Sequence, residues 1–593
     1  MTERPAAGAT PGAAPEWGSD VIAAMLRELG VEYVALNPGA SFRGLHDSLV
    51  NHLGNDRPEI VICNHEEVAV AIAHGYAKLL GRAMAVALHS NVGLMHASMG
   101  LFCAWADRQP VLALGGTGPM DSSKRRPWID WVHTSNAQGE LVRDYVKWDH
   151  QPGGVAAIPE AILRAWQVIH QEPRGPAYLS FDVSHQEERL TSALPLPDLS
   201  RYPHAAPLWP DPDMVRHAAQ LLVGALHPVI LPGRVPPTQQ VWDDLQELAE
   251  LLGAAVLADW KSPTSFTSTH DLQQNAETNF VDEDTATILA QADVILSLDR
   301  IDPAGTLRAG QAAPTAQLIH VSPDVFAVRA WSADHQELPP ATVPLVASIA
   351  PTISALVVEV RAARSRDGSA AGRIADRATA LRSRRRQIVA RWAAERTAAW
   401  DRSPLSLARV LGELRLALGP RARDAILARA TLNWPRAAWE FDRPAAYLGG
   451  DGGGGIGSGP GMAVGTALAA RGSGRPVIAV LGDGDLLMAP TALWTAAHHD
   501  IPLLVVVANN QTYLNDEEHQ ERVAIARGRP VANRWIGQRM DRPAVDFARL
   551  ASSMGVESFG PIAESTDLAP AFAGALRVLD EGRPVLVDAR ISR

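Results

Sequence analysis

Short, wholly apolar runs alternate with helical segments along most of this chain of 593 residues, and no other feature restricts its fold as strongly. Two of these runs, 477–481 and 501–508, contain no charged residue, which is typical of strands covered on both faces. A helix-like segment, 491–500, lies between them. Because a strand–helix–strand connection of this kind makes parallel neighbours, the alternation predicts an α/β fold built on parallel sheets.

The alternation falls into three blocks, each of ordinary domain length. The predicted divisions are a flexible tail at 1–16, a first domain at 17–194, a central domain at 205–360, a basic helical linker at 361–402 and a last domain at 403–593. In the last block the expected strands are 445–450, 475–484, 501–510 and 583–591. We therefore predict three doubly wound parallel-sheet domains. The arginines of the linker predict a solvated connecting helix, with an anionic-ligand site as the alternative.

Composition excludes several classes of function. A net charge of -11 and the lack of a basic patch with interleaved aromatics argue against a nucleic-acid partner. Two cysteines, Cys63 and Cys103, are too few for a disulfide framework or a cysteine-rich metal site. The N-terminus lacks the apolar core of a signal peptide, and no apolar run reaches the roughly 18 residues of a membrane span. We expect a cytoplasmic protein without a membrane partner.

The segment LGDGDLLMAP, 481–490, ends one of the apolar strands with two aspartates among glycines. In a right-handed crossover the following strand ends at the same sheet edge, so Asp483 and Asn510 are expected to lie close together. Carboxylate and amide oxygens are hard ligands that suit magnesium, which completes its coordination with phosphate oxygens and water. A helix beginning after Asp485 would direct its N-terminus at the same crevice and favour phosphate. A tight turn would explain Gly-Asp-Gly alone, but the asparagine pair favours a metal-bound diphosphate.

Gly-Asp-Gly followed by Asn-Asn at this spacing resembles the signature of the thiamine diphosphate-dependent enzymes, the family of 2-oxo acid decarboxylases and acetolactate synthases. The resemblance implies that Asp483, Asn510 and the backbone carbonyl of Thr512 bind magnesium. It also implies a pyrimidine-binding, a central and a diphosphate-binding domain. The segment NHEEVAVAIAHGYAKLLG resembles the family's helix start, which implies that Glu66 activates the cofactor through its aminopyrimidine ring. The general preference of acidic residues for helix N-termini is the alternative explanation of Glu66.

The glycine-rich segment 449–465 resembles the family's loop beneath the cofactor. The resemblance implies that the carbonyl of Gly454 receives the pyrimidine amino group and that Ile456 supports the bent cofactor. It also assigns cofactor contacts at the acidic turn and the asparagine pair, namely Gly482, Gly484 and Asn509.

The nearest resemblance within the family is to the benzoylformate decarboxylase group, carried by LNPGASF, ALHSNVGLMHASMGLFCAW and ALWTAAHHDIPLLVVVANNQTY. It implies catalytic roles for His89, which could move protons on the reacting molecule, and for His270 in the central domain. A histidine satisfied at a strand end is the alternative for His89. The polar stretch after the asparagine pair offers Glu518, within 517–519, as a further proton-transfer group. An exposed acidic helix start explains that stretch equally well.

Two positions depart from the family pattern. Ala40 replaces a serine that the decarboxylase group uses toward the carboxylate of its substrate, which argues against benzoylformate itself as the substrate. Asp485 follows Gly-Asp-Gly where a serine often faces the diphosphate. A second carboxylate there would repel a diphosphate unless it is turned away or bound to other donors.

These observations predict a thiamine diphosphate- and magnesium-dependent lyase that breaks or makes a carbon–carbon bond next to a carbonyl. Non-oxidative decarboxylation of a 2-oxo acid to an aldehyde, with possible carboligation, is the leading form. The alternatives are an acetolactate synthase-like carboligase, a 2-hydroxyacyl-CoA lyase, and an inactive thiamine-fold subunit. The expected partners are a 2-oxo acid, aldehyde or acyl-CoA substrate and a second copy of the chain, in a homodimer or homotetramer whose cofactor lies between subunits.

Overall fold

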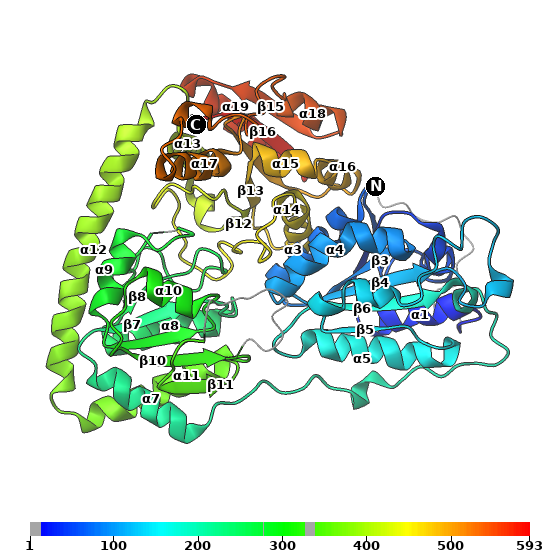
Figure 1. The fold of residues 1–593 in the computed structure, drawn as a ribbon, viewed down its shortest axis with the longest axis horizontal. Helices are drawn as coiled ribbons and strands as arrows, with labels where there is room; N and C mark the ends of the chain where they lie inside the picture. The colour runs from blue at the N-terminus through cyan, green and yellow to red at the C-terminus, as the bar shows by residue number, and fades with distance from the viewer. Residues whose placement is uncertain (1–13, 277, 327–337) are drawn as a thin grey trace.

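The computed structural model describes residues 14–276, 278–326 and 338–593. Most of the tail predicted at 1–16 lies outside these residues. Three parallel sheets, each covered by helices, form the corners of a triangle, with a long helix along one side (Figure 1). The predicted three parallel-sheet α/β domains are confirmed.

The first sheet has six strands in the order β2-β1-β3-β4-β6-β5. Its strands are β1 (Tyr33–Leu36), β2 (Glu59–Ile62), β3 (Met84–Leu88), β4 (Val111–Thr117), β5 (Trp148–His150) and β6 (Ala177–Asp182). The helices around it are α1 (Gly18–Glu28), α2 (Arg43–Asp47), α3 (Glu66–Leu80), α4 (Ser90–Ala106), α5 (Ile158–His170) and α6 (Val183–Gln186). β3 and β4 are buried along their whole length, as strands between two helical layers must be.

The central sheet has five strands in the order β11-β10-β9-β7-β8. Its strands are β7 (Pro228–Pro232), β8 (Ala255–Val256), β9 (Val294–Leu298), β10 (Gln317–Ser322) and β11 (Val343–Val346). Its helices are α7 (Pro212–Gly224), α8 (Gln239–Leu252), α9 (Glu283–Gln291), α10 (Pro303–Ala309) and α11 (Ile349–Arg366).

The third sheet also has five strands, in the order β12-β13-β14-β16-β15. Its strands are β12 (Ile426–Arg429), β13 (Val477–Gly482), β14 (Leu504–Asn509), β15 (Glu557–Ile562) and β16 (Val585–Arg590). Its helices are α13 (Leu407–Leu418), α14 (Ser458–Ala469), α15 (Asp483–Met488), α16 (Thr491–His498), α17 (Leu514–Ala526), α18 (Phe547–Ser553) and α19 (Leu568–Asp580).

The edge strand of the third sheet differs from the prediction. The segment 445–450 is not a strand; it pairs with β12 only at Tyr447, which bridges to Leu427. The backbone then turns at Gly449, where φ is 82°, in the region that favours glycine. The edge strand is β12 instead, which lies beside β13.

The basic linker is the helix α12 (Ala370–Trp400), which runs along one side of the molecule (Figure 1). Several of its arginines form contacts with the neighbouring domains, although the side chains of Arg382 and Arg391 stay about half exposed. Arg382 Nε donates to Asp271 Oδ2 at 2.8 Å, and Arg391 pairs with Asp284 of the central domain. Arg396 Nη1 donates to the carbonyl of Arg436, beyond the helix, at 3.1 Å. The helix therefore binds the central domain to the last one, which the prediction of a solvated connector did not include.

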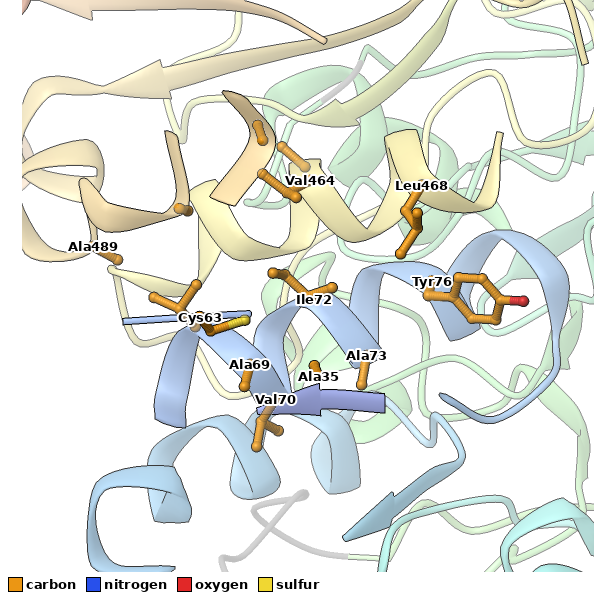
Figure 2. Close-up of a cluster of buried hydrophobic side chains, with 14 of the residues drawn as sticks. Ala35, Cys63, Ala69, Val70, Ile72, Ala73, Tyr76, Val464, Leu468 and Ala489 are labelled. Carbon is orange, nitrogen blue, oxygen red and sulfur yellow. The ribbon is translucent and has the colours of Figure 1, made fainter. Parts of the chain in front are cut away.

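The first and third domains share one hydrophobic core, centred on the crossing of α3 and α14. Figure 2 shows Ile72 of α3 beside Val464 of α14 within this core. Glycines bring the two backbones into contact: a Cβ at Gly75 would lie 2.1 Å from a carbonyl oxygen of α14, and one at Gly465 would lie 1.9 Å from the Ile72 carbonyl. Because α3 begins at Glu66 and α14 follows the glycine-rich loop, this crossing fixes two predicted parts of the site relative to each other.

A buried charge cluster joins the same two domains. Lys78 at the end of α3 pairs with Asp107, and both side chains are at most 4% exposed. His74 Nε2 lies 2.7 Å from the same Asp107 oxygen, and Lys78 Nζ donates to the carbonyl of Gly450 at 2.6 Å. The lysine thus attaches the first domain to the start of the glycine-rich loop.

Candidate active site

The acidic turn and the asparagine pair meet at one edge of the third sheet, as predicted. β13 and β14 are parallel neighbours, and Gly482 pairs with Ala508. Asp483 begins α15 and accepts hydrogen bonds from the backbone N–H groups of Gly484, at 2.9 Å, and of Gln511. Gln511 has a φ of 61°, which turns the chain so that its amide faces Asp483. The helix therefore begins at Asp483 itself, not after Asp485, and it has only six residues.

Asp483 is a carboxylate held away from water. Its exposure is 3%. Burial raises the pKa of its carboxyl to about 6, against the lowering effect of the backbone N–H groups of Gly484 and Gln511. The backbone N–H of Thr512 donates to Asn510 Oδ1 at 3.0 Å, which holds the amide oxygen at the same loop. One carboxylate, one amide and the nearby backbone carbonyls form an oxygen donor set that suits a hard divalent cation.

A cavity of about 520 Å³ opens in front of this loop. Its lining includes the predicted positions Gly454, Ile456, Gly482, Asp483, Asn510 and Thr512. Gly484 also lines the cavity, but its missing Cβ leaves room for the ring of Tyr513, 2.5 Å from that position. At Gly454, whose φ is 70°, no atom lies within 4 Å of a Cβ position, so the loop leaves open space there. These features fit a cofactor that carries a diphosphate and needs room above the glycine-rich loop.

Asn509 differs from its predicted role. It is 1% exposed, and its Nδ2 donates to Asp588 Oδ1 at 2.8 Å, beneath the sheet edge rather than in the cavity. Side chains alternate along a strand, so when Asn510 turns toward the cavity its predecessor turns away. Asn509 therefore supports the strand end and does not line the cavity.

Glu66 lies in the first domain as the first residue of α3. His65 caps this helix, with Nδ1 accepting from the Glu67 N–H at 3.2 Å. The Glu66 carboxylate is 4% exposed, and its Oε2 lies 3.1 Å from His96 Nδ1 on α4. Its other oxygen would lie 3.1 Å from a Cβ at Gly93, so α4 approaches the carboxylate closely because that position is glycine. The residues that line the cavity in front of the Asp483 loop all come from 407–593, so Glu66 does not line it in the same chain.

His96 was missed by sequence reasoning. It stacks on His65 with ring centroids 5.0 Å apart and is the side chain in hydrogen-bond range of Glu66. The sequence offered little signal for it, because His89 precedes α4 in an extended conformation and helix periodicity therefore does not relate the two histidines.

His89 is half-buried at the start of α4. Its Nδ1 accepts from the Ser41 N–H at 3.3 Å and lies 2.9 Å from Ser41 Oγ, so the neutral ring carries its proton on Nε2. Burial lowers the pKa of His89, and the nearby His133 and Arg126 lower it further. Ala40 has no hydroxyl, but the next residue, Ser41, does. That hydroxyl contacts the His89 ring.

The other two predicted catalytic residues lie outside the cavity in front of the Asp483 loop. His270 lies between α8 and α12 in a separate cavity of about 560 Å³, with Nε2 3.1 Å from Glu250 Oε1. Glu518 is half-exposed on α17. Its neighbour Glu517 turns inward instead.

Glu517 is 2% exposed and supports the loop that carries Asn510 and Thr512. It pairs with Thr512 Oγ1 and lies 3.2 Å from Arg539 Nε. Burial raises the pKa of Glu517, but the Thr512 hydroxyl and the Arg539 guanidinium outweigh it and hold that pKa below its usual value. A paired, ionised carboxylate of this kind anchors a loop and does not readily exchange protons.

No cluster of three or more His, Cys, Asp or Glu side chains suited to a metal was found in the part of the chain that the structure describes. The candidate metal site at the Asp483 loop is of a different type, because most of its ligand atoms would be amide and backbone oxygens. No helix among the described residues is long and apolar enough to cross a membrane.

Comparison with known proteins assigns the family. Three models of the thiamine pyrophosphate enzymes match the chain: the N-terminal TPP binding domain at residues 16–144, the central domain at 215–356 and the C-terminal TPP binding domain at 431–589. The chain belongs to the thiamine pyrophosphate enzymes.

Relatives of this thiamine pyrophosphate enzyme cover nearly its whole length. It is 25% identical to benzoylformate decarboxylase of Pseudomonas aeruginosa, over 95% of this chain and 97% of that protein. It is 23% identical to the acetolactate synthase large subunit of Haemophilus influenzae, over 91% and 88% of the two chains. The family resemblance predicted from the sequence is confirmed.

Solved structures share the fold. The benzoylformate decarboxylase of Polynucleobacter necessarius has a TM-score of 0.76 and 21% identity over 98% of this chain and 99% of that one. The thiamine diphosphate-dependent 4-hydroxybenzoylformate decarboxylase of Rhodococcus jostii has a TM-score of 0.72 and 23% identity over 97% and 99%.

Proposed function

We propose that this thiamine pyrophosphate enzyme is a magnesium-dependent lyase that decarboxylates a 2-oxo acid to an aldehyde. The observation that carries the proposal is the Asp483 loop, where a buried carboxylate and the Asn510 amide face a cavity above a glycine-rich loop. Asp483, Asn510 and the carbonyl of Thr512 would hold the magnesium, and Gly454 and Ile456 would contact the cofactor. Thiamine diphosphate supplies, when bound, a carbon that adds to a carbonyl and accepts the negative charge left by bond cleavage.

The residues of the first domain would handle protons. Glu66, nearly excluded from water, would hydrogen-bond the pyrimidine ring and hold or release a proton at its carboxylate. His96, 3.1 Å away and on the exposed side, would link that carboxylate to solvent. The neutral His89 ring would donate from Nε2 to the substrate or receive a proton after its own is transferred.

The site would be completed by a second copy of the chain. The cavity is lined by the last domain, while Glu66 lies in the first domain, which also exposes apolar side chains that a partner could cover. These exposed side chains are Met95 (56% exposed), Trp128 (79%) and Trp131 (69%). A homodimer or homotetramer would place Glu66 of one copy at the cavity of its partner. Sedimentation of an active monomer would contradict this arrangement.

Carboligation is the second candidate, and the similarity to acetolactate synthase large subunits favours it. The same site would release an aldehyde when the reacting carbon is protonated, or join it to a second carbonyl when one is present.

The test is a panel of 2-oxo acids, aldehydes and 2-hydroxyacyl-CoA esters, presented with magnesium and thiamine diphosphate. Carbon dioxide released with aldehyde from a 2-oxo acid supports decarboxylation, and a new 2-hydroxy ketone supports carboligation. Cleavage restricted to the thioesters would contradict both. Asp483→Ala should lose thiamine diphosphate on gel filtration, whereas Glu66→Gln should retain it and lose most turnover.

A further inference from the structure

We propose that Asp451, Arg429 and Asp485 form an ion-pair clamp that holds the glycine-rich loop in its cofactor-ready shape. Asp485, the second aspartate of LGDGDL, is in this view a positioning residue and not a ligand of the metal or the diphosphate. The clamp is visible in the structure itself, while its consequence for the cofactor rests on the proposed function.

Arg429 is the centre of the clamp. It ends β12, and its side chain is 12% exposed between two carboxylates that are nearly excluded from water. Its Nη2 lies 2.9 Å from Asp451 Oδ2, and its Nε lies 3.6 Å from Asp485 Oδ2. Burial alone would lower the pKa of Arg429, but the two aspartates raise it, so the guanidinium stays charged.

Each carboxylate also holds a backbone amide of the loop. Asp451 Oδ1 accepts from the Gly454 N–H at 2.7 Å, and its Oδ2 accepts from Ser458 Oγ at 3.0 Å. Asp485 Oδ1 accepts from the Gly457 N–H at 2.6 Å. Gly454 and Gly457, with φ values of 70° and 106°, are flexible positions that the two carboxylates fix.

A third glycine shows that the packing is adapted to Asp485. A Cβ at Gly459, in the first turn of α14, would lie 2.2 Å from Asp485 Oδ2 and 2.9 Å from its Cγ. The carboxylate cannot move aside without losing Arg429 or the Gly457 amide. Glycine at 459 and aspartate at 485 are therefore structurally coupled.

The clamp reduces the repulsion between Asp485 and a diphosphate. This residue lines the same cavity as Asp483, and a free carboxylate there would repel a diphosphate. Because one oxygen of Asp485 accepts the Gly457 amide and the other lies 3.6 Å from the Arg429 guanidinium, which it shares with Asp451, part of its charge is compensated before any phosphate arrives. The competing hypothesis is that Asp485 contacts magnesium directly. It predicts that a shorter neutral side chain at 485 would weaken magnesium binding and leave the conformation of the loop unchanged.

The experiment compares Asp485→Ser, Arg429→Met, Gly459→Ala and the double variant Gly459→Ala/Asp485→Ser. The matched control is Asp580→Asn, which breaks an exposed aspartate–arginine pair with Arg421 in the same domain. Amide hydrogen exchange of the peptide 450–458 is measured in the cofactor-free protein. The KM for thiamine diphosphate and kcat at saturating cofactor are measured separately.

In Asp485→Ser and Arg429→Met we expect the hydrogen-exchange rate of the loop amides to rise about 10-fold. The KM for thiamine diphosphate should rise by a similar factor. The kcat at saturating cofactor should change less than about 3-fold, because the loop is restored when the cofactor is bound. Gly459→Ala should behave like Asp485→Ser, and the double variant should be no worse than Asp485→Ser alone. Asp580→Asn should match the wild type.

Unchanged exchange in Asp485→Ser, or additive losses in the double variant, would overturn the clamp. A raised magnesium requirement with normal loop exchange would assign Asp485 to the metal instead. A wild-type protein that binds no thiamine diphosphate would refute the proposed function. The hydrogen-exchange rates would still show whether the ion-pair clamp holds the loop.

Discussion

Replacing Lys78 by Met should destabilise the contact between the first and last domains strongly. The change keeps most of the side-chain volume but leaves Asp107 as a buried carboxylate, 4% exposed, with His74 as its remaining partner in the cluster. It also removes the donor to the Gly450 carbonyl. Removing one partner of a buried ion pair costs about 3–5 kcal/mol. Because His74 still donates to Asp107, we expect about 3 kcal/mol, at the lower end of that range.

The assay is thermal unfolding of the cofactor-free protein at one fixed scan rate. For domains of this size a loss of about 3 kcal/mol lowers Tm by about 6–12 °C. The double variant Lys78→Met/Asp107→Asn removes the uncompensated charge and should recover at least half of the loss. A Tm within about 2 °C of the wild type would refute the reasoning, since it would mean that the buried pair contributes little. A double variant less stable than Lys78→Met would refute it as well.

Three further predictions concern the site and the domain contact. Gly93→Ala should push the Glu66 carboxylate by a few tenths of an ångström, lowering kcat about 3- to 10-fold with an unchanged circular dichroism spectrum. Gly39→Ala should lower kcat further, by about 100-fold, because the new Cβ would lie 2.5 Å from Cβ and Cγ of His89, which cannot rotate away. Equal losses of kcat in the two variants would contradict the reasoning. His499 accepts a backbone N–H of the first domain at 2.9 Å, and burial lowers its pKa from 6.5 to about 4. Between pH 4 and 6.5 the unfolded chain therefore binds more protons at His499 than the folded protein does. The contribution of His499 to the free energy of unfolding is complete above pH 6.5 and is lost as the pH falls toward 4. Because His499 is half-exposed, we expect about 1 kcal/mol of lost stability between pH 7 and 5, and a smaller pH dependence of the urea midpoint in His499→Gln.

The sequence predicted the positions of site residues correctly wherever the geometry of the chain alone determines them. Two apolar runs joined by a helical crossover must end at the same sheet edge, so the meeting of Asp483 and Asn510 followed from the crossover rule. The family motifs placed Glu66 at a helix start, and α3 begins there. The division into domains at the predicted residues stays a prediction.

Other features depend on contacts that no local pattern encodes. The role of Asp485 depends on Arg429, which is distant in the sequence and lies on a strand that was predicted in the wrong place. Asn509 and Asn510 look alike in sequence, and only strand alternation decides which one reaches the cavity. Glu517 and Glu518 are likewise neighbours with opposite surroundings, because the arginines that pair with Glu517 follow α17.

The contact between α3 and α14 has a consequence for synthesis of the chain on the ribosome. Gly75 and Gly465 touch the opposite helix, yet they are 390 positions apart (465 − 75). At roughly 5–20 residues per second, α3 would wait about 20–80 s for the helix that covers it. During that time the apolar side chains around Ile72 have no partner from the last domain, and the nascent first domain is exposed to aggregation. A cell that makes this protein must shield that helix face until α14 has emerged.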